Sequence, residues 1–260
     1  MGNGQKGRTR SAYAVGAAVL ALILWELTGR LHIASPMVVP VPSGIAGAST
    51  SLLSSREFYQ NWFSTLTIWA LALTIGLAVG LVLGLSSGAS TTVYATLSPL
   101  LGYMRAIPPI VLFPVALVAL GPGCLPIGVV ATLGAAVYVF PGTAQAAREA
   151  SQRYSPLARI MGYSRLQFLR HFVAPGAAFH ALAAVRVAAT YSFAACVGGE
   201  MIIGGRLGVG AAILDLSERY QLEEAYLYVL LAGFVGILID FGSGRLSKRW
   251  AVAVIAPTRQ

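Results

Sequence analysis

The sequence predicts an all-α integral membrane protein with six transmembrane helices. Of its 260 residues, 57% are hydrophobic and only 10% are charged, whereas a soluble domain carries roughly 25% charged residues. The apolar residues gather in six long runs, and the basic residues are concentrated in alternate connections between them. This composition excludes a disordered chain and argues against an ordinary soluble enzyme.

The six apolar runs are long enough to cross a bilayer, whose apolar core of about 30 Å requires roughly 20 helical residues. We expect these spans at residues 12–31, 62–85, 93–120, 126–147, 179–203 and 225–241. The first run follows a basic start, as a cleaved signal peptide would. Its length, the internal Glu26 and the lack of a small-x-small cleavage site favour a retained helix.

Proline and glycine mark departures from uniform spans. Residues 32–61 contain three prolines and then a polar stretch, so we expect an outer loop followed by a short interfacial helix. Prolines within 93–120 predict a kinked span, because proline removes a backbone donor. In the second run, glycines at every fourth residue form a row on one helix face, where a neighbouring backbone can approach closely. These glycines are Gly76, Gly80, Gly84 and Gly88.

The distribution of basic residues predicts the orientation. With six spans both termini lie on one side, which receives twelve of the eighteen Lys and Arg residues, while the other side receives four. The excess of Lys and Arg predicts that the termini are cytoplasmic. We expect a cytoplasmic N-terminus at 1–11, a core of five spans at 62–247 and a cytoplasmic C-terminus at 248–260. The net charge of +9 therefore indicates a bilayer topology and not a nucleic-acid partner.

No catalytic or metal-binding motif is present in the sequence. The chain has no GxxxxGK[ST] phosphate loop, no HExxH pair and no nucleophile elbow. Its two cysteines and three histidines show no ligand spacing. We therefore expect no enzyme activity, no metal and no cofactor in this chain, so that energy must come from a partner or from a gradient.

Residues 148–175, called here the basic segment, are amphipathic and rich in arginine. Apolar residues interleave with five arginines, and Glu149 is the one acidic residue. Gly162 would permit a turn between two short helices, and Pro175 would end the unit before the next span. The pattern fits a segment that docks on a soluble partner. It also fits a basic helix resting on anionic lipid, and the residues alone do not separate the two.

The basic segment resembles the conserved cytoplasmic loop of ABC importer permeases. Gly162 and Pro175 occupy the family's glycine and proline positions, and Phe172 occupies the hydrophobic one. Other stretches resemble the sulfonate, nitrate and taurine branch, so that the resemblance covers nearly the whole chain. They are Val41-Pro42-Ser43, Arg105 to Pro109 with Pro114, Gly199-Glu200-Met201, Gly208-Val209-Gly210 and Ile213-Leu214-Asp215. One position differs from the family's pattern, because Pro156 stands where the family has its signature glutamate.

The resemblance implies the type I ABC importer permease fold with a cytoplasmic coupling-helix loop at 148–175. It implies a bacterial inner-membrane subunit that works as a pair of copies, with ATPase subunits that bind ATP and Mg, and with an extracytoplasmic binding protein. The imported solute would be small and polar or anionic. The ATPase-docking residues carried over are Gly162, Ser164, Arg165, Gln167, Phe168, Arg170, Phe172 and Pro175.

Charges within the spans suggest where a solute passes. An unpaired charge at mid-bilayer is costly, so Glu200 should face protein or water. Arg105, just before a double proline, is a plausible lining for anion passage. The pathway candidates are Arg105, Pro108, Pro109, Glu200 and Met201, and the candidates for binding-protein docking are Asp215, Glu218, Glu223 and Glu224.

Structural roles compete with these functional ones. Glu200 can instead pair with Arg105 or with a backbone donor and hold helices together. Arg186 fits an interfacial anchor, and Glu26 and Asp240 fit structural positions near the membrane boundaries. A gradient-driven carrier or channel is the alternative function, and it would require acidic relay residues in several spans or an inverted repeat.

Overall fold

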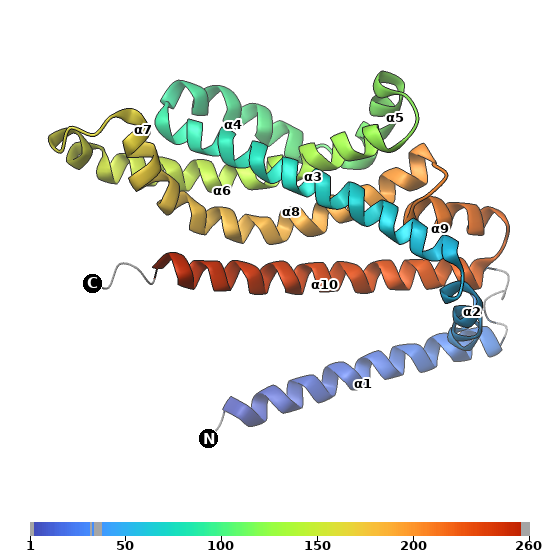
Figure 1. Ribbon diagram of the computed structural model, residues 1–260. Coiled ribbons are helices and arrows are strands. Elements are labelled where there is room, and N and C mark those ends of the chain that lie inside the picture. Colours follow the sequence, from blue (N-terminus) through green and yellow to red (C-terminus); the bar gives the residue numbers. More distant parts are fainter. Residues whose placement is uncertain (1–2, 32, 34–37, 256–260) are drawn as a thin grey trace. The chain divides into compact units, whose positions relative to one another are not determined.

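The computed structural model describes the backbone of residues 3–31, 33 and 38–255, and it describes no side chains for 1–12, 14–15, 89, 165, 176, 178–182 and 246–255. The described residues are helical or in short connections, which confirms the all-α class (Figure 1). The helices are α1 (Asn3–Arg30), α2 (Pro42–Leu53), α3 (Arg56–Ala89), α4 (Thr91–Ala106), α5 (Pro109–Leu120), α6 (Cys124–Ile160), α7 (Arg165–Phe168), the π-helical turn η1 (Leu169–Val173), α8 (Ala174–Ile203), α9 (Val209–Glu218) and α10 (Leu222–Ile255).

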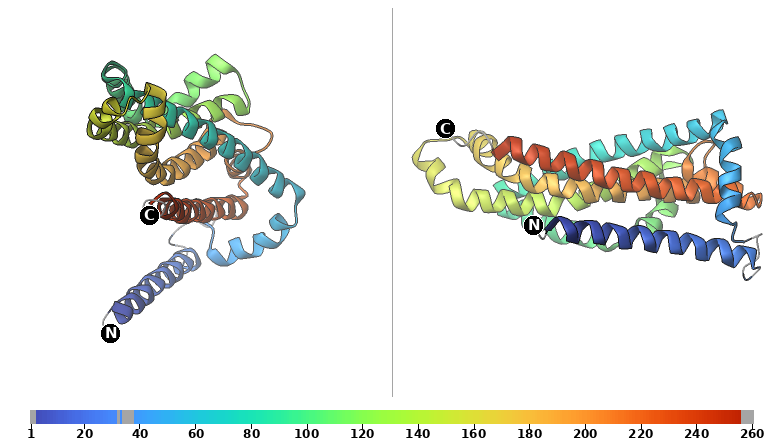
Figure 2. Two further views of the ribbon diagram at one scale, coloured as in Figure 1. Left: turned by 60° about the vertical axis from the view of Figure 1, so that its left-hand side comes forward. Right: turned by 90° about the horizontal axis from the view of Figure 1, so that it is seen from below.

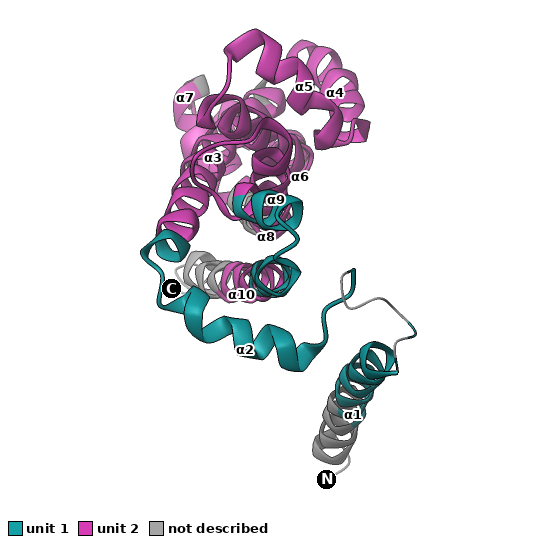
Figure 3. Cartoon of the chain, turned by 90° about the vertical axis from the view of Figure 1, so that its right-hand side faces the viewer, with its two compact units in different colours: residues 1–59, 212–231 teal, residues 60–211, 232–260 magenta. Residues whose placement is uncertain are grey.

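The chain divides into two compact units (Figure 3). The smaller unit comprises residues 1–59 and 212–231, and the larger comprises 60–211 and 232–260. Within the smaller unit, Trp25 donates its indole N–H to the Pro40 carbonyl at 3.1 Å, and the rings of Phe58 and Tyr228 lie 5.3 Å apart. The larger unit contains α4 to α8 and most of α3, and the buried polar groups described below lie in it.

Several described helices are long and apolar enough to span a bilayer. Three do so singly: α3 over Arg56–Gly88, α6 over Cys124–Ile160 and α10 over Leu222–Arg245. The pair α4 and α5 passes the same test together, as a broken span or as a re-entrant loop. The predicted runs at 12–31 and 179–203 lie largely within α1 and α8. The expected short helix before the second span is α2.

The prolines within the predicted span at 93–120 do more than kink one helix, because α4 and α5 are separate helices that differ in direction by 101°. Ile107 and Pro108 between them have extended backbones, with ψ of 120° and 134°. A residue that precedes proline is displaced from the α region, and two successive prolines apply this restriction twice. Pro109 then begins α5, where a missing N–H costs no hydrogen bond.

Arg148 to Ile160 continue helix α6, whereas the sequence analysis placed the loop boundary at residue 148. Amphipathicity over this stretch therefore marks the end of a long helix and not a separate element. Pro156 lies inside the helix, and it removes one backbone donor without ending it.

The glycine row of α3 packs against α6, as predicted. A Cβ placed on any of the four glycines would lie 2.3–2.8 Å from the Cβ of a small or β-branched residue on α6, closer than real Cβ atoms approach. The pairs are Gly76 with Ala135, Gly80 with Val139, Gly84 with Thr143, and Gly88 with Ala147. Both rows advance four residues at a time, so the two helices remain in contact along four turns.

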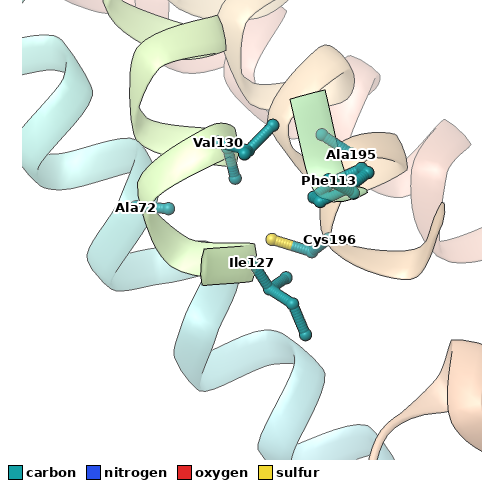
Figure 4. Close-up of a cluster of buried hydrophobic side chains, with 7 residues drawn as sticks. Ala72, Phe113, Ile127, Val130, Ala195 and Cys196 are labelled. Carbon is teal, nitrogen blue, oxygen red and sulfur yellow. The ribbon is translucent and has the colours of Figure 1, made fainter. Parts of the chain in front are cut away.

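Helices α6 and α8 pack along each other and form the centre of the larger unit (Figure 2). The rings of Tyr138 and Tyr191 meet between them, with centroids 4.5 Å apart. At one end, side chains from four helices converge on a buried cluster (Figure 4). Its labelled members are Ala72 of α3, Phe113 of α5, Ile127 and Val130 of α6, and Ala195 and Cys196 of α8. This cluster holds the second half of the broken span against the bundle.

Candidate functional site

Helix α6 ends in a glycine cap at the turn of the basic segment. Gly162 has a φ of +69°, the left-handed region that glycine adopts without strain. Its N–H donates to the Arg159 carbonyl at 3.2 Å, and the Tyr163 N–H donates to the Ala158 carbonyl at 3.0 Å. These two bonds form a Schellman motif, which satisfies the last carbonyls of the helix and fixes the direction of the departing chain.

Helix α7 begins at once with a capping box. The Ser164 N–H donates to the side-chain oxygen of Gln167 at 2.9 Å, and the Gln167 N–H donates to the Ser164 hydroxyl at 3.3 Å. This reciprocal pair satisfies two donors that a helix start leaves unpaired. Two short-range motifs therefore fix the turn between α6 and α7.

The chain then passes through η1 into α8 without leaving helical geometry. The Ala174 N–H donates five residues back, to the Leu169 carbonyl. Pro175 follows in the first turn of α8 and has no N–H to extend the hydrogen-bonding pattern across the junction. Single π turns of this kind widen a helix locally and are frequent at functional sites.

The aromatic residues of the basic segment face the chain itself. Phe172 lies at the centre, with ring centroids 5.4 Å from Tyr163, 5.7 Å from Tyr154 and 5.8 Å from Phe168. Below them, Val173 is buried in a small cluster with alanines of α6 and α8. These contacts attach the segment to the end of the bundle. Phe168 and Phe172 thus pack inward, although they are among the predicted docking residues.

Several apolar side chains of the segment are exposed among its polar ones, and we call Ile160, Met161 and Leu166 its outward face. Ile160 and Leu166 expose 84% and 75% of their surface, and Met161 is exposed beside them. Arg170 is exposed as well, and the side chain of Arg165 lies outside the described residues. No direct signal in the sequence separates Leu166 from its inward neighbours. The ring contacts of the half-buried Phe168 and Phe172 show which residues face inward.

Glu200 is the most deeply buried charged residue among those described, with 2% of its surface exposed. One of its carboxylate oxygens accepts the Gly210 N–H at 2.9 Å, and the Thr65 hydroxyl lies 2.8 Å and 2.9 Å from the two oxygens. Gly208 is required beside it, because a Cβ there would lie 2.6 Å from the carboxylate carbon. The carboxylate therefore pairs with a helix N-terminal N–H, an arrangement favoured by the helix dipole.

Thr65 and Asn61 extend this network from one turn of α3. The Thr65 hydroxyl oxygen accepts the Val209 N–H at 2.9 Å, and the Asn61 side-chain oxygen accepts the Gly208 N–H at 3.0 Å. Three successive backbone N–H groups, those of Gly208, Val209 and Gly210, are thereby satisfied. The network ties the start of α9 to α3 and α8. We call these residues the Glu200 network: Asn61, Thr65, Glu200, Gly208, Val209 and Gly210.

Arg105 does not pair with Glu200, so of the two partners considered the backbone donor is the one present. Arg105 is exposed at the end of α4, beside the break at Pro108 and Pro109. It lines a small cavity with residues that include Tyr138 and Tyr191. Met201, next to Glu200, is exposed.

Two other charges within helices are paired. The Arg186 guanidinium donates to the Asp240 carboxylate through two nitrogens, and so joins α8 to α10. Glu26 accepts hydrogen bonds from Arg30 at 2.7 Å and from the Ser43 hydroxyl at 2.8 Å. These pairs support the structural roles proposed for Glu26 and Asp240.

The acidic residues predicted to dock a binding protein lie in and after α9. Asp215 pairs with Arg219 at 2.8 Å, one helical turn away, and Glu218 is exposed. Glu223 and Glu224 occupy the first turn of α10, where the helix dipole favours negative charge. Within the described residues, no group of three or more histidine, cysteine, aspartate or glutamate side chains could hold a metal ion.

An all-helical fold with several helices long and apolar enough to cross a bilayer defines the chain as an integral membrane protein. Residues 76–250 match the family described as "Binding-protein-dependent transport system inner membrane component", so the chain belongs to that family. The match includes the basic segment, both halves of the broken span and Glu200. It confirms the resemblance to ABC importer permeases.

Curated relatives are named as permease proteins of bicarbonate, nitrate and taurine transport systems. The bicarbonate transport system permease protein CmpB of Synechococcus elongatus is 30% identical over 56% of this chain and 52% of its own length. The nitrate import permease protein NrtB of Synechocystis is 29% identical over 57% of this chain and 54% of its own. This chain thus spans about half the length of these relatives. The taurine transport system permease protein TauC of Escherichia coli is 22% identical over 91% of this chain and 87% of its own.

A solved structure supports the fold. The chain superposes on one from the inward-facing MetNI methionine ABC transporter with a TM-score of 0.61, at 20% identity. The alignment covers 78% of this chain and 97% of that one. This similarity establishes the type I importer permease architecture and nothing about the solute.

Proposed function

We propose that this chain is the transmembrane subunit of an ATP-driven importer, and that it forms the solute pathway and transmits the movement of partner ATPases. The observation that carries the proposal is the turn of the basic segment. It is fixed by a Schellman motif and a capping box, anchored by an inward aromatic cluster, and apolar on its exposed face. A rigid element with an apolar outer face is suited to pass on a partner's displacement, because its own backbone does not deform first.

The ATPase would meet the outward face of the segment. Ile160, Met161 and Leu166 would fill an apolar groove, and Arg170 would pair with acids at its rim. Gly162, Ser164, Gln167 and Pro175 act by setting the backbone, while Phe168 and Phe172 hold the segment to the bundle. Arg165 belongs to the proposed surface by its place in the sequence. This side of the membrane would be cytoplasmic, as the excess of basic residues predicts.

The broken span would form part of the solute pathway. The extended backbone at Ile107 and Pro108 interrupts the helix, and a non-helical backbone occurs at membrane depth only where protein or water covers it. Arg105 places a cation at this break, which suits an anionic solute. Met201 exposes a side chain beside Glu200. Glu200 itself is enclosed, so we assign it a positioning role at the pathway and not direct contact with solute.

We propose a small polar or anionic solute, such as nitrate, bicarbonate or a sulfonate, in line with the names of the relatives. The acidic residues of α9 and of the first turn of α10 would meet the binding protein on the outer face. Two copies of the chain would assemble with two ATPase subunits in the bacterial inner membrane, and those subunits would bind ATP and Mg.

This function is tested by ATP hydrolysis in a reconstituted complex. The chain is purified with its partner ATPase and binding protein, and ATP hydrolysis is measured with nitrate, bicarbonate, taurine, glucose and lysine. We expect the binding protein to stimulate ATP hydrolysis in the presence of nitrate, bicarbonate or taurine. Neutralising Asp215, Glu218, Glu223 and Glu224 together should weaken that stimulation. Stimulation by lysine or glucose alone would reject the anion assignment.

A further inference from the structure

A cavity of about 450 Å³ lies at the end of the larger unit that carries the basic segment. Helix α6 forms one wall, and Tyr163, Phe168, Leu169 and Val173 form another. Its lining does not include Ile160 or Leu166 of the outward face. Its volume is in the range of small-molecule sites.

The α6 wall is polar and basic. Arg148, Gln152, Ser155 and Arg159 fall on one stripe of the helix, at intervals of three or four residues, and all line the cavity. Neither Arg148 nor Arg159 takes part in the three ion pairs found among the described residues. Glu149, the one acidic residue of the segment, is not in the lining, and its carboxylate accepts a hydrogen bond from Gln145 at 3.0 Å. The cavity therefore has uncompensated positive charge.

Two groups within it have unused hydrogen-bonding capacity. The Ser151 hydroxyl oxygen is buried and has no hydrogen-bond partner among the described residues. One turn earlier, the half-buried Arg148 guanidinium lies 4.2 Å from the centre of the Tyr94 ring. Stacking on a ring holds a guanidinium in place without using its N–H donors. A buried polar group without a partner is uncommon in folded proteins and calls for a ligand or a water molecule.

We propose that this cavity binds a small oxyanion that carries a short apolar group, with the oxyanion at Arg148 and Ser151. Arginine and hydroxyl donors recognise sulfonate and phosphate oxygens with charge-assisted hydrogen bonds. The opposite wall of Phe168, Leu169 and Val173 accommodates an aliphatic tail. Arg159, about 16 Å further along the helix axis, adds to the positive potential without contacting the same oxygens.

Two sources share this chemistry, a free organic anion in solution and the headgroup of an anionic lipid. The inference stands apart from the proposed transport function, because binding is measured on the full chain alone. An apolar peptide from the ATPase is disfavoured here. The exposed apolar residues Ile160, Met161 and Leu166 are not in the lining of the cavity.

The test is calorimetric titration of the detergent-purified chain with butanesulfonate at low ionic strength. We expect binding that Arg148→Gln weakens at least about tenfold and that Ser151→Ala weakens about fivefold. Arg153→Gln is the matched control, since Arg153 is exposed on the same helix but does not line the cavity. Butylammonium should not bind.

A parallel arm places each variant in nanodiscs of phosphatidylcholine with or without phosphatidylglycerol and records the thermal midpoint. The lipid headgroup is identified as the oxyanion if phosphatidylglycerol raises the thermal midpoint, Arg148→Gln abolishes that rise, and butanesulfonate does not bind. The proposal is overturned if neither probe responds. It is also overturned if Arg153→Gln weakens binding as much as Arg148→Gln, because that would indicate a diffuse basic surface.

Discussion

Replacing Glu200 with alanine is expected to destabilise the folded chain by about 3–5 kcal/mol and to abolish transport. The substitution leaves the Gly210 N–H without its acceptor, removes an acceptor of the Thr65 hydroxyl, and opens a cavity in a fully buried site. The start of α9 would lose its attachment to α8. The loss of stability is measured as a lower midpoint of thermal denaturation in detergent, with light scattering as the signal.

The matched variant Glu200→Gln separates positioning from charge. A glutamine oxygen can still accept the Gly210 N–H, and its amide can donate to Thr65, whose hydroxyl then turns to the Asn61 carbonyl at 3.2 Å. We expect this variant to retain most of the stability and transport. If glutamine is as damaging as alanine while the protein still folds, the carboxylate charge is required and the positioning role is wrong.

Leu166→Asp is expected to release the partner ATPase without unfolding the chain. Leu166 is 75% exposed, so a polar replacement there changes stability by no more than about 0.5 kcal/mol. In a docked complex the same carboxylate would be buried in an apolar groove. Loss of a central interface contact of this kind costs at least about 2 kcal/mol, or roughly thirtyfold in affinity. Co-purification of the tagged ATPase measures the effect.

The control for this prediction is Leu53→Asp at the end of α2, where the leucine is 42% exposed and lies far from the basic segment in the sequence. We expect Leu53→Asp to retain the ATPase. Should Leu166→Asp retain it too, with transport unchanged, the outward face of the segment is not the docking surface.

The fold could be predicted in outline because its main signals are local and repeated. Apolar runs of bilayer length mark the spans, and the four-residue glycine spacing in α3 marks a helix contact that the matching row on α6 confirms. The break at Ile107 was predicted only as a kink. Two adjacent prolines show that a helix is disturbed, but no local pattern gives the direction in which the next helix leaves, so the 101° angle is known only from the folded chain.

The site could be predicted only in part, for the same reason. The glycine turn at Gly162 is a local signal, and the Ser164–Gln167 capping box could have been found from its S-x-x-Q spacing. Glu200 was identifiable as an acid in an apolar run. Its partner Thr65 lies 135 residues away, and Asn61 joins the network through the Gly208 N–H. Both differ little from other polar residues at the ends of spans, so only the folded chain reveals their roles.

We propose that this chain moves a solute with energy from a partner ATPase. The most direct measurement is uptake of labelled nitrate, bicarbonate or taurine by proteoliposomes that contain the chain and its ATPase, with binding protein outside. We expect uptake that requires ATP at the ATPase and is unchanged when ionophores collapse the ion gradients. Uptake by the chain alone, driven by a gradient without ATP, would contradict the claim and identify a secondary carrier.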